Sequence, residues 1–196
     1  SDGIKQGYGI FKDNLGNIYE GDWLNDMKMG SGTFKDVNGD TYVGDWVNDF
    51  RHGRGKITYS NGDNYEGDWV DDVKEGQGVE IFIADGVTYS GQFKSGLFHG
   101  KGEYKSKIGD LYNGNWSSGK QDGQGIYKSS IGDKYEGSWK NGMKHGKGKY
   151  EFVDGSMYNG EWENDNINGD GKYTFSDGSI CTCLLYTSPS PRDLRA

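Results

Sequence analysis

Apolar and polar residues alternate along short stretches that recur through most of the chain. In the stretch YEGDW, the residues Tyr19, Gly21 and Trp23 alternate with two acidic residues. A period of two places these three residues on one face of a β-strand and the acids on the other. The stretch GSGTF at residues 30–34 alternates in the same way. The pattern therefore predicts short strands that each carry aromatic rings and glycines on one face.

Two markers repeat with one common period. The tyrosine of the first stretch recurs as Tyr19, Tyr42, Tyr65, Tyr89, Tyr112, Tyr135 and Tyr158. The spacing is 23 residues, except for one spacing of 24 residues between Tyr65 and Tyr89. A Gly-x-Gly pair, first seen at Gly7, keeps the same phase, including the single longer step. Such a period is typical of a repeat protein in which each repeat is one small structural unit.

Each repeat predicts a β-hairpin. Dipeptides such as Asn38-Gly39 and Asp154-Gly155 separate the two strands, and they supply the positive φ that tight turns require. The residues after each tryptophan are predicted to be a linker to the next hairpin. The extra residue of the longer repeat lies within residues 79–85, where a β-bulge and a longer turn are both compatible with it. The fold class is all-β: an elongated single-layer antiparallel sheet of about eight stacked β-hairpins.

The aromatic row is the first candidate site. Glycine on a neighbouring strand leaves room for a large ring across the ladder, so the rings can form the core of a single sheet. The same row could also line a groove for a peptide or a helix. Phe93 stands where the other repeats have tryptophan and is expected to interrupt the row. The candidate groove or core residues are Tyr19, Trp23, Tyr42, Trp46, Tyr65, Trp69, Tyr112, Trp116, Tyr135, Trp139, Tyr158 and Trp162.

Positive charge is the second candidate. The net charge of the chain is −8, which argues against nucleic acid as a partner. Two local basic clusters nevertheless lie in this acidic chain, and they are candidate contacts for an anionic lipid headgroup such as a phosphoinositide. Their residues are Arg51, Arg54, Lys56, Lys140, Lys144, Lys147 and Lys149. The net negative charge disfavours an anionic membrane, because each basic residue near the surface contributes only about 1 kcal/mol.

Other motifs do not support catalysis or metal binding. Gly-x-Gly recurs in every repeat and precedes an aromatic strand, whereas nucleotide-binding loops need a strand–loop–helix context. The histidines His52, His99 and His145 share one repeat position two repeats apart, about 19 Å by strand spacing, so they cannot share a metal. The turn acids do not match a calcium-binding loop. We expect no enzyme activity in these residues, no catalytic residue, no metal and no cofactor.

The repeats resemble MORN repeats (membrane occupation and recognition nexus). The family pattern is Tyr-x-Gly-x-Trp/Tyr followed by Gly-x-x-x-Gly-x-Gly, and residues 5–180 follow it closely, as in YEGSWKNGMKHGKGKY. The first glycine of the second motif is present at Gly96, Gly119 and Gly142. Aspartate replaces it elsewhere, at Asp26, Asp49, Asp72 and Asp165. The resemblance implies an elongated sheet of stacked hairpins, in agreement with the prediction from the residues.

The pattern ends near residue 182. The next tyrosine and tryptophan would fall at positions that hold Cys181 and Leu185, and both prolines of the chain follow in the last residues. The stretch CLLYTSPSPRD resembles the translation of a sequencing adaptor. We therefore divide the chain into a repeat array, 1–182, expected to be truncated at both ends, and a non-native tail, 183–196, expected to be disordered.

The function expected from the sequence is that of a non-enzymatic scaffold that binds other proteins. The resemblance implies a cytoskeletal, ciliary or membrane-adjacent assembly in the cytoplasm, with a peptide or helix along the sheet and a homodimer through repeat ends as partners. The alternative is a regulatory or phosphoinositide-binding segment of a larger enzyme, such as a phosphatidylinositol phosphate kinase or a lysine methyltransferase.

Overall fold

The computed structural model describes residues 3–185, and these residues form sixteen β-strands and no helix. The chain divides into two compact units, residues 1–98 (unit 1) and residues 99–196 (unit 2), and the division falls within β9. The first eight strands are β1 (Gly7–Lys12), β2 (Ile18–Leu24), β3 (Met27–Lys35), β4 (Thr41–Val47), β5 (Phe50–Thr58), β6 (Asn64–Val70), β7 (Val73–Phe82) and β8 (Val87–Lys94). The others are β9 (Leu97–Lys105), β10 (Leu111–Ser117), β11 (Lys120–Lys128), β12 (Lys134–Lys140), β13 (Met143–Glu151), β14 (Met157–Glu163), β15 (Asn166–Thr174) and β16 (Ile180–Leu185).

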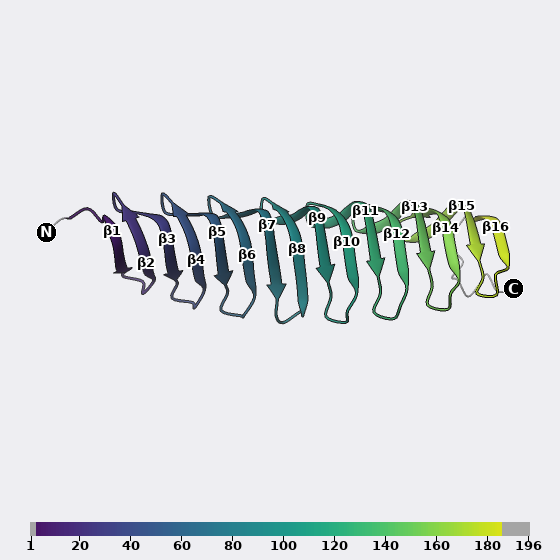
Figure 1. Cartoon of the computed structure of the whole chain (residues 1–196), viewed down its shortest axis with the longest axis horizontal. Helices are drawn as coiled ribbons and strands as arrows, with labels where there is room; N and C mark the ends of the chain where they lie inside the picture. Colours follow the sequence, from purple (N-terminus) through teal and green to yellow (C-terminus); the bar gives the residue numbers. More distant parts are fainter. Residues whose placement is uncertain (1–2, 186–196) are drawn as a thin grey trace. The chain divides into compact units, whose positions relative to one another are not determined.

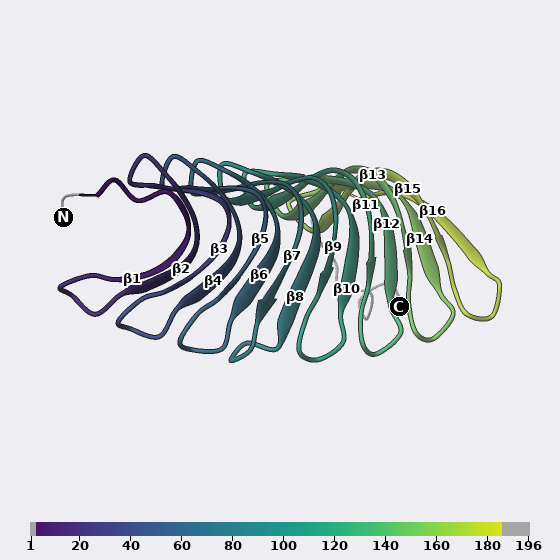
Figure 2. The ribbon, with the colours of Figure 1, turned by 60° about the vertical axis from the view of Figure 1, so that its left-hand side comes forward.

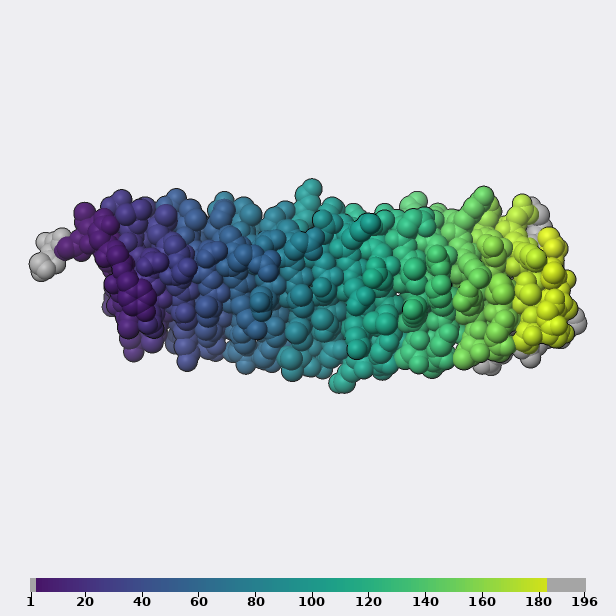
Figure 3. Space-filling view, viewed as in Figure 1, coloured from purple at the N-terminus to yellow at the C-terminus, as the bar shows by residue number. Residues whose placement is uncertain are grey.

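Within each unit every strand pairs antiparallel with its neighbours in the sequence. In unit 1 the ladder runs from β1 to β8, and in unit 2 it runs from β9 to β16 (Figure 1). In Figure 3 the colours accordingly change gradually along each unit, because residues close in the sequence are also neighbours in space. These strands confirm the predicted all-β fold of stacked antiparallel hairpins. None of the described segments has the length and apolarity of a membrane-spanning helix.

The register places the aromatic residues of both strands on one face, which we call the aromatic face. Tyr19 of β2 lies opposite Phe34 of β3, and Phe34 lies opposite Tyr42 of β4. Trp23 lies opposite Lys28, so the basic side chain shares this face. Because side chains alternate along a strand, the acidic residues of the YxGxW stretches lie on the opposite face.

Glycines pair across the ladder where the tyrosine ring crosses it. Gly21 lies opposite Gly32, and a Cβ atom on Gly21 would lie 2.5 Å from the Cα atom of Gly32. A Cβ atom on Gly32 would overlap the ring of Tyr19. This space lets the ring lie against the backbone, so Tyr19 is 2% exposed although one sheet forms the unit. The predicted mechanical role of the glycines is therefore visible in the structure.

The residues after each tryptophan form a tight turn, whereas the sequence predicted a linker. Asn25 and Asp26 both have positive φ, 50° and 67°, and the next strand begins at Met27. Positive φ at both central residues defines a type I′ turn, whose twist matches that of the flanking strands. We call these connections the short turns. The prediction was wrong here because each strand has hairpin turns at both of its ends.

The other connections, which we call the long turns, contain the predicted glycines in the left-handed region. Gly39 has φ 101° and its N–H donates to the carbonyl of Asp36. The longer repeat keeps this glycine as Gly86, whose N–H donates to Ile83. The ladder between β7 and β8 stays in register from Gly76 to Phe82, so the turn absorbs the extra residue and no bulge forms between these strands.

The strands are bent. The pairing of β4 with β5 shifts between Gly44 and Trp46, and Gly53 on the bulged strand has φ 63°. The same shift recurs in other hairpins, as between Gly137 and Trp139. Such irregularities bend a strand locally, and Figure 2 shows the hairpins of unit 1 as open arcs.

The last strand extends past the boundary expected at residue 182. The backbone of residues 183–185 pairs with Gly169, Asp170 and Gly171 of β15. Backbone groups can join a ladder whatever side chains they carry, so the strand does not depend on the repeat pattern. The rest of the predicted tail, residues 186–196, lies outside the described residues.

Candidate interaction face

Aromatic rings form one continuous chain of edge-to-face contacts in each unit. Tyr19 contacts Trp23 of its own repeat at 5.0 Å and Trp46 of the next repeat at 5.4 Å, between ring centroids. Tyr42 bridges Trp46 and Trp69 in the same way. Such pairs contribute about 0.5–1.5 kcal/mol each beyond the buried area. Within each unit the ring chain therefore connects successive repeats.

The ring chain of unit 1 continues through the position of the missing tryptophan. Phe93 contacts Tyr65 at 4.9 Å and Tyr89 at 5.2 Å, so the expected interruption does not occur. In unit 2 the chain runs through Tyr112, Trp139, Tyr135 and Trp162. All twelve candidate aromatics are buried, with exposed fractions of 8% or less.

The polar atoms of these rings are also satisfied inside the sheet. The Tyr42 hydroxyl donates to the carbonyl of Asp45, and Trp46 Nε1 donates to the carbonyl of Gly32 in the preceding repeat. Burial raises the pKa of Tyr19 to about 12. The rings therefore serve as the core, and they leave a ligand little surface and none of these hydrogen-bonded polar atoms.

A row of basic side chains covers the rings of unit 1. Three of them belong to the strand that follows a short turn, and Lys5 precedes β1; each lies within 6 Å of at least two ring centroids, a cation–π distance. The row consists of Lys5, Lys28, Arg51 and Lys74. Lys28 is the best example, with its Nζ atom 4.6 Å from the Trp46 centroid and 4.7 Å from that of Phe34. Burial lowers the pKa of the Lys28 ammonium, and Asp49 opposes this effect.

The aspartates that replace the family glycine fix this basic row. Asp49 Oδ1 accepts a hydrogen bond from the Lys28 backbone N–H at 2.9 Å. Asp72 Oδ1 accepts bonds from both the backbone N–H and the Nε–H of Arg51, at 3.0 and 2.7 Å. Both aspartates have positive φ in their short turns. Each aspartate therefore links its own repeat to the preceding repeat through hydrogen bonds.

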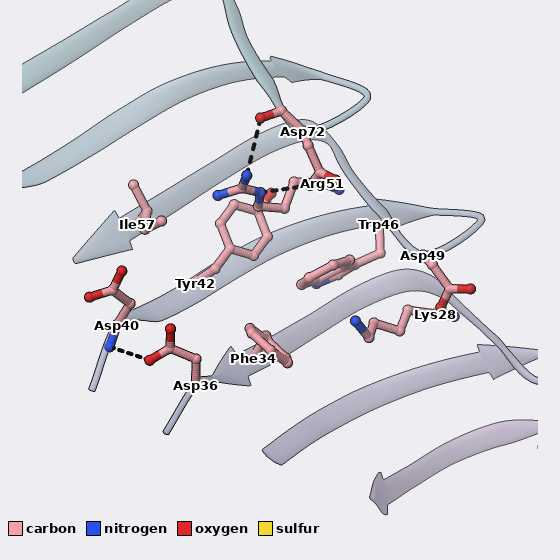
Figure 4. Close-up of a pocket in the computed structure, with 10 residues that line it drawn as sticks. All are labelled: Lys28, Phe34, Asp36, Asp40, Tyr42, Trp46, Asp49, Arg51, Ile57 and Asp72. Atoms are coloured by element: carbon pink, nitrogen blue, oxygen red, sulfur yellow. Dashed lines mark hydrogen bonds and ion pairs between the residues drawn. The ribbon is translucent and has the colours of Figure 1, made fainter. Parts of the chain in front are cut away.

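A recess of about 300 Å³ opens on the aromatic face of unit 1. Its floor is aromatic and aliphatic, formed by Phe34, Tyr42 and Trp46 beside Ile57 (Figure 4). The walls carry charge of both signs. The charged lining residues are Lys28, Asp36, Asp40, Asp49, Arg51 and Asp72.

The two walls of the recess differ. At the long-turn end lie Asp36 and Asp40, and at the other end lie Lys28 and the pair of Arg51 with Asp72 (Figure 4). Asp36 Oδ1 accepts from the Asp40 N–H at 2.9 Å, and Asp40 Oδ1 accepts from the Ser60 N–H at 2.8 Å. One oxygen of each carboxylate thus holds the backbone of the turns.

The longer repeat places a charged residue where the preceding repeats have the apolar residues Phe34 and Ile57. Glu80 lies opposite Tyr65, is 7% exposed and forms an ion pair with Lys74 on the aromatic face. The ammonium of Lys74 also lies 5.0 Å from the Tyr65 centroid. A buried pair of this kind requires both partners, because either one alone would be an uncompensated charge.

Unit 2 has a different aromatic face. Lys144 lies over Trp162 at 5.0 Å and over Tyr150 at 5.1 Å, and burial lowers its pKa. Tyr127 and Tyr150 stand where unit 1 has Phe34 and Ile57, and their hydroxyls donate to turn carboxylates, Tyr150 to Asp133 at 2.9 Å. Tyrosine hydroxyls therefore occupy carboxylate oxygens of the long turns in unit 2.

The structure does not bring the predicted basic clusters together on one surface. Arg51 and Lys144 lie on the aromatic face, over rings. Arg54 and Lys56 lie on the opposite face, paired with Asp68 and Glu66. The remaining candidates are Lys140, Lys147 and Lys149, of which Lys149 pairs with Glu151 at 2.6 Å. Alternation along the strand separates residues that are close in the sequence.

Sequence reasoning identifies three of the lining residues as candidates, Tyr42, Trp46 and Arg51, and misses Lys28, Asp36 and Asp40. The available signal is positional, because basic residues recur 23 residues apart at Lys5, Lys28 and Arg51.

Comparisons with solved structures concern the fold. The structure resembles the TCP domain of SAS-4 (dCPAP) of Drosophila melanogaster, in complex with a proline-rich motif of Ana2 (dSTIL), with 12% identity and a TM-score of 0.50 over 91% of this chain and 90% of that one. The wild-type TCP10 domain of Danio rerio CPAP gives 13% identity and a TM-score of 0.35 over 90% and 94%. At this identity the first likeness concerns the fold alone. A search of curated proteins finds no match.

The model of the MORN repeat matches this chain seven times in succession. The matched residues are 19–41, 42–64, 65–84, 89–111, 112–134, 135–157 and 158–180. Each match begins at a core tyrosine; five of the seven end at the residue before the next match or tyrosine, the one at 65–84 ends in a long turn, and the last ends at residue 180. The match covers most of the chain and agrees with the hairpins in the structure. The chain belongs to the MORN-repeat family.

Proposed function

We propose that this protein is a non-enzymatic scaffold that binds an extended segment of a partner protein along the aromatic face of unit 1. The recess beside Tyr42 and Trp46 is the observation that carries this proposal. Phe34, which is half-buried, supplies apolar contact area beside the buried rings of Tyr42 and Trp46, and charged groups at both walls supply orientation, as in other peptide-binding grooves. The proline-rich motif held by the Drosophila TCP domain is consistent with an extended occupant.

The rings at the floor favour binding without rearrangement. Tyr42 and Trp46 are fixed by hydrogen bonds to the backbone and by edge-to-face contacts, so their positions exist before a partner arrives. A preorganised site loses less conformational entropy on binding. The setting implied by the family, a cytoskeletal, ciliary or membrane-adjacent assembly in the cytoplasm, belongs to this proposal.

The basic residues give less support to lipid binding. Arg54 and Lys56 form ion pairs on the face opposite Arg51, so the candidates do not converge on one headgroup. Unit 1 contains nine Lys and Arg against seventeen Asp and Glu, a net charge of −8. Such a surface repels an anionic membrane.

The proposal can be tested by site-specific photocrosslinking. A phage library of random linear peptides is selected on the whole chain, and the selected pool is then crosslinked to chains that carry benzoylphenylalanine in place of Phe34 or of Val43. Phe34 lines the recess, and Val43 is 54% exposed in the same hairpin on the opposite face. We expect crosslinks at position 34 and few at position 43. A library that yields no binders, or equal crosslinking at both positions, would refute the proposal.

A further inference from the structure

The groups that line the recess recur at a fixed spacing along unit 1. Each repeat contributes two strands, so equivalent residues such as Tyr19, Tyr42 and Tyr65 lie about 9.6 Å apart along the sheet. Asp13 stands one repeat before Asp36, and Asp63 stands one repeat after Asp40, whereas the other equivalent positions hold Asn17 and Tyr59. A bound segment therefore meets at least one turn carboxylate in each of three successive repeats.

This spacing selects among the regular backbone conformations. Three residues of a polyproline II segment span about 9.3 Å and complete one turn, a misfit of about 0.3 Å per repeat. Seven residues of an α-helix span about 10.5 Å, a misfit of about 0.9 Å that grows to about 2.7 Å over three repeats. In an extended strand, the side chains on one face recur every two residues, about 6.7 Å, so they do not match the repeat spacing of about 9.6 Å even over one repeat. A polyproline II segment fits best.

The charge of the recess selects the side chains of the segment. The lining contains two basic and four acidic residues. Asp72 already pairs with Arg51, whereas the Lys28 ammonium lies over rings and its backbone N–H donates to Asp49. These two basic and two acidic residues together carry no net charge.

The charge that remains for a ligand lies on the long-turn wall. Asp36 and Asp40 form no ion pair among the described residues. Asp36 Oδ2 accepts from the Asn38 amide at 3.4 Å, and Asp40 has a second oxygen beyond the one that accepts the Ser60 N–H. A basic partner side chain at each repeat would match this wall.

We infer that the recess of unit 1 binds a polyproline II segment that carries a basic residue at every third position, with one turn of the segment per repeat. This inference rests on the proposed function and specifies the conformation and charge of the partner segment. Proline positions face the aromatic floor around Tyr42 and Trp46, and basic positions face Asp36 and Asp40.

Fluorescence anisotropy with labelled twelve-residue peptides tests the inference on the whole chain. The probe is (Pro-Pro-Arg)₄, which spans about 37 Å, or roughly four repeats. One control is (Pro-Pro-Gln)₄, which keeps the backbone and removes the charge. A second control has the composition of the probe but places its arginines in two adjacent pairs. We expect both controls to bind at least fivefold more weakly than the probe.

Variants assign the charge contacts to the recess. Asp36→Asn and Asp40→Asn keep the Oδ1 acceptor for the turn N–H groups, so folding is retained and thermal melting can verify it. We expect each to weaken the probe two- to fivefold, the range of one solvent-exposed ion pair. Glu66→Gln is the matched control, because Glu66 is exposed on the opposite face, and it should leave binding unchanged.

The outcomes separate the two proposals. Equal binding of the probe and the glutamine peptide would overturn the charge assignment, and equal binding of the permuted peptide would overturn the one-turn-per-repeat register. If the arginine probe fails while selected peptides crosslink at Phe34, this inference falls and the scaffold function stands. If neither binds, both are wrong.

Discussion

Gly32→Ala tests whether the glycines exist to admit the tyrosine rings. The new Cβ atom would lie 2.5 Å from the Tyr19 Cζ atom and even closer to the hydroxyl, so the ring must move. Overpacking of this kind costs about 1–3 kcal/mol. A displaced ring also loses the hydrogen bond from its hydroxyl to the Asp22 carbonyl, which contributes about 0.5–1.5 kcal/mol. We expect a loss of about 3 kcal/mol in the free energy of unfolding, or roughly 6–12 °C in Tm.

Gly9→Ala is the matched control. Gly9 occupies the same repeat position as Gly32. Tyr19 lies 13 residues before Gly32, whereas the chain has no equivalent tyrosine before Gly9. A Cβ atom on Gly9 would meet only Trp23, at 3.8 Å, an ordinary contact. Its φ is not in the left-handed region, so alanine is expected to be neutral, within about 0.5 kcal/mol.

The free energy of unfolding of both variants is measured by urea and thermal denaturation. Gly9 lies in the first strand, so its location is a second explanation for a small cost, and a double-mutant cycle separates the two explanations. In a Tyr19→Ala background the ring is absent, so Gly32→Ala should cost much less than in the wild-type protein. Equal costs of Gly32→Ala with and without the Tyr19 ring would refute the reasoning, because the clash would then not be the cause.

Three further results are expected. Asp49→Ala should lower the free energy of unfolding by about 1–2 kcal/mol in urea melts, because alanine keeps the unfavourable positive φ and loses the hydrogen bond to Lys28. Asp49→Gly should cost less than half as much, because glycine tolerates the positive φ. The reverse order would disprove the role of Asp49 in linking the two repeats. Glu80→Ala should cost about 3–5 kcal/mol by the same assay, because it leaves Lys74 buried and unpaired, and a neutral result would show that the ammonium reaches water. Burial raises the pKa of Tyr19 to about 12 in the folded chain, against about 10 when unfolded, so its contribution to stability is complete below pH 10 and lost as the pH rises through 12. If the urea midpoint of the wild-type chain falls no more steeply between pH 10 and 12 than that of Tyr19→Phe, this prediction is wrong.

The fold was predictable because its causes are local and repeated. The alternation of Tyr19, Gly21 and Trp23 specifies a strand and its buried face in seven successive copies. The positive φ of Gly39 follows from the turn dipeptide alone. The short turns were missed even though Asn141-Gly142 is a strong hairpin signal, because the other turn of each repeat had already been assigned as the hairpin.

The recess was not predictable in the same way, because it depends on register between repeats. Lys28 reaches the rings of Tyr19 and Trp46 only because it lies opposite Trp23 on the ladder. Arg51 and Arg54 are three residues apart, yet the irregular pairing and strand alternation send them to opposite faces. Spacing in the sequence gives no direct measure of these contacts.

The order of the strands also determines how each unit responds to force. Antiparallel hydrogen bonds lie perpendicular to the strands, and each strand pairs only with its neighbours in the sequence. A pull on the first and last strands of a unit therefore loads one ladder at a time, so strands peel off singly instead of resisting together. Each repeat that opens releases roughly 80 Å of extended chain. Such a unit yields in small steps at low tension and can lengthen without losing its remaining repeats.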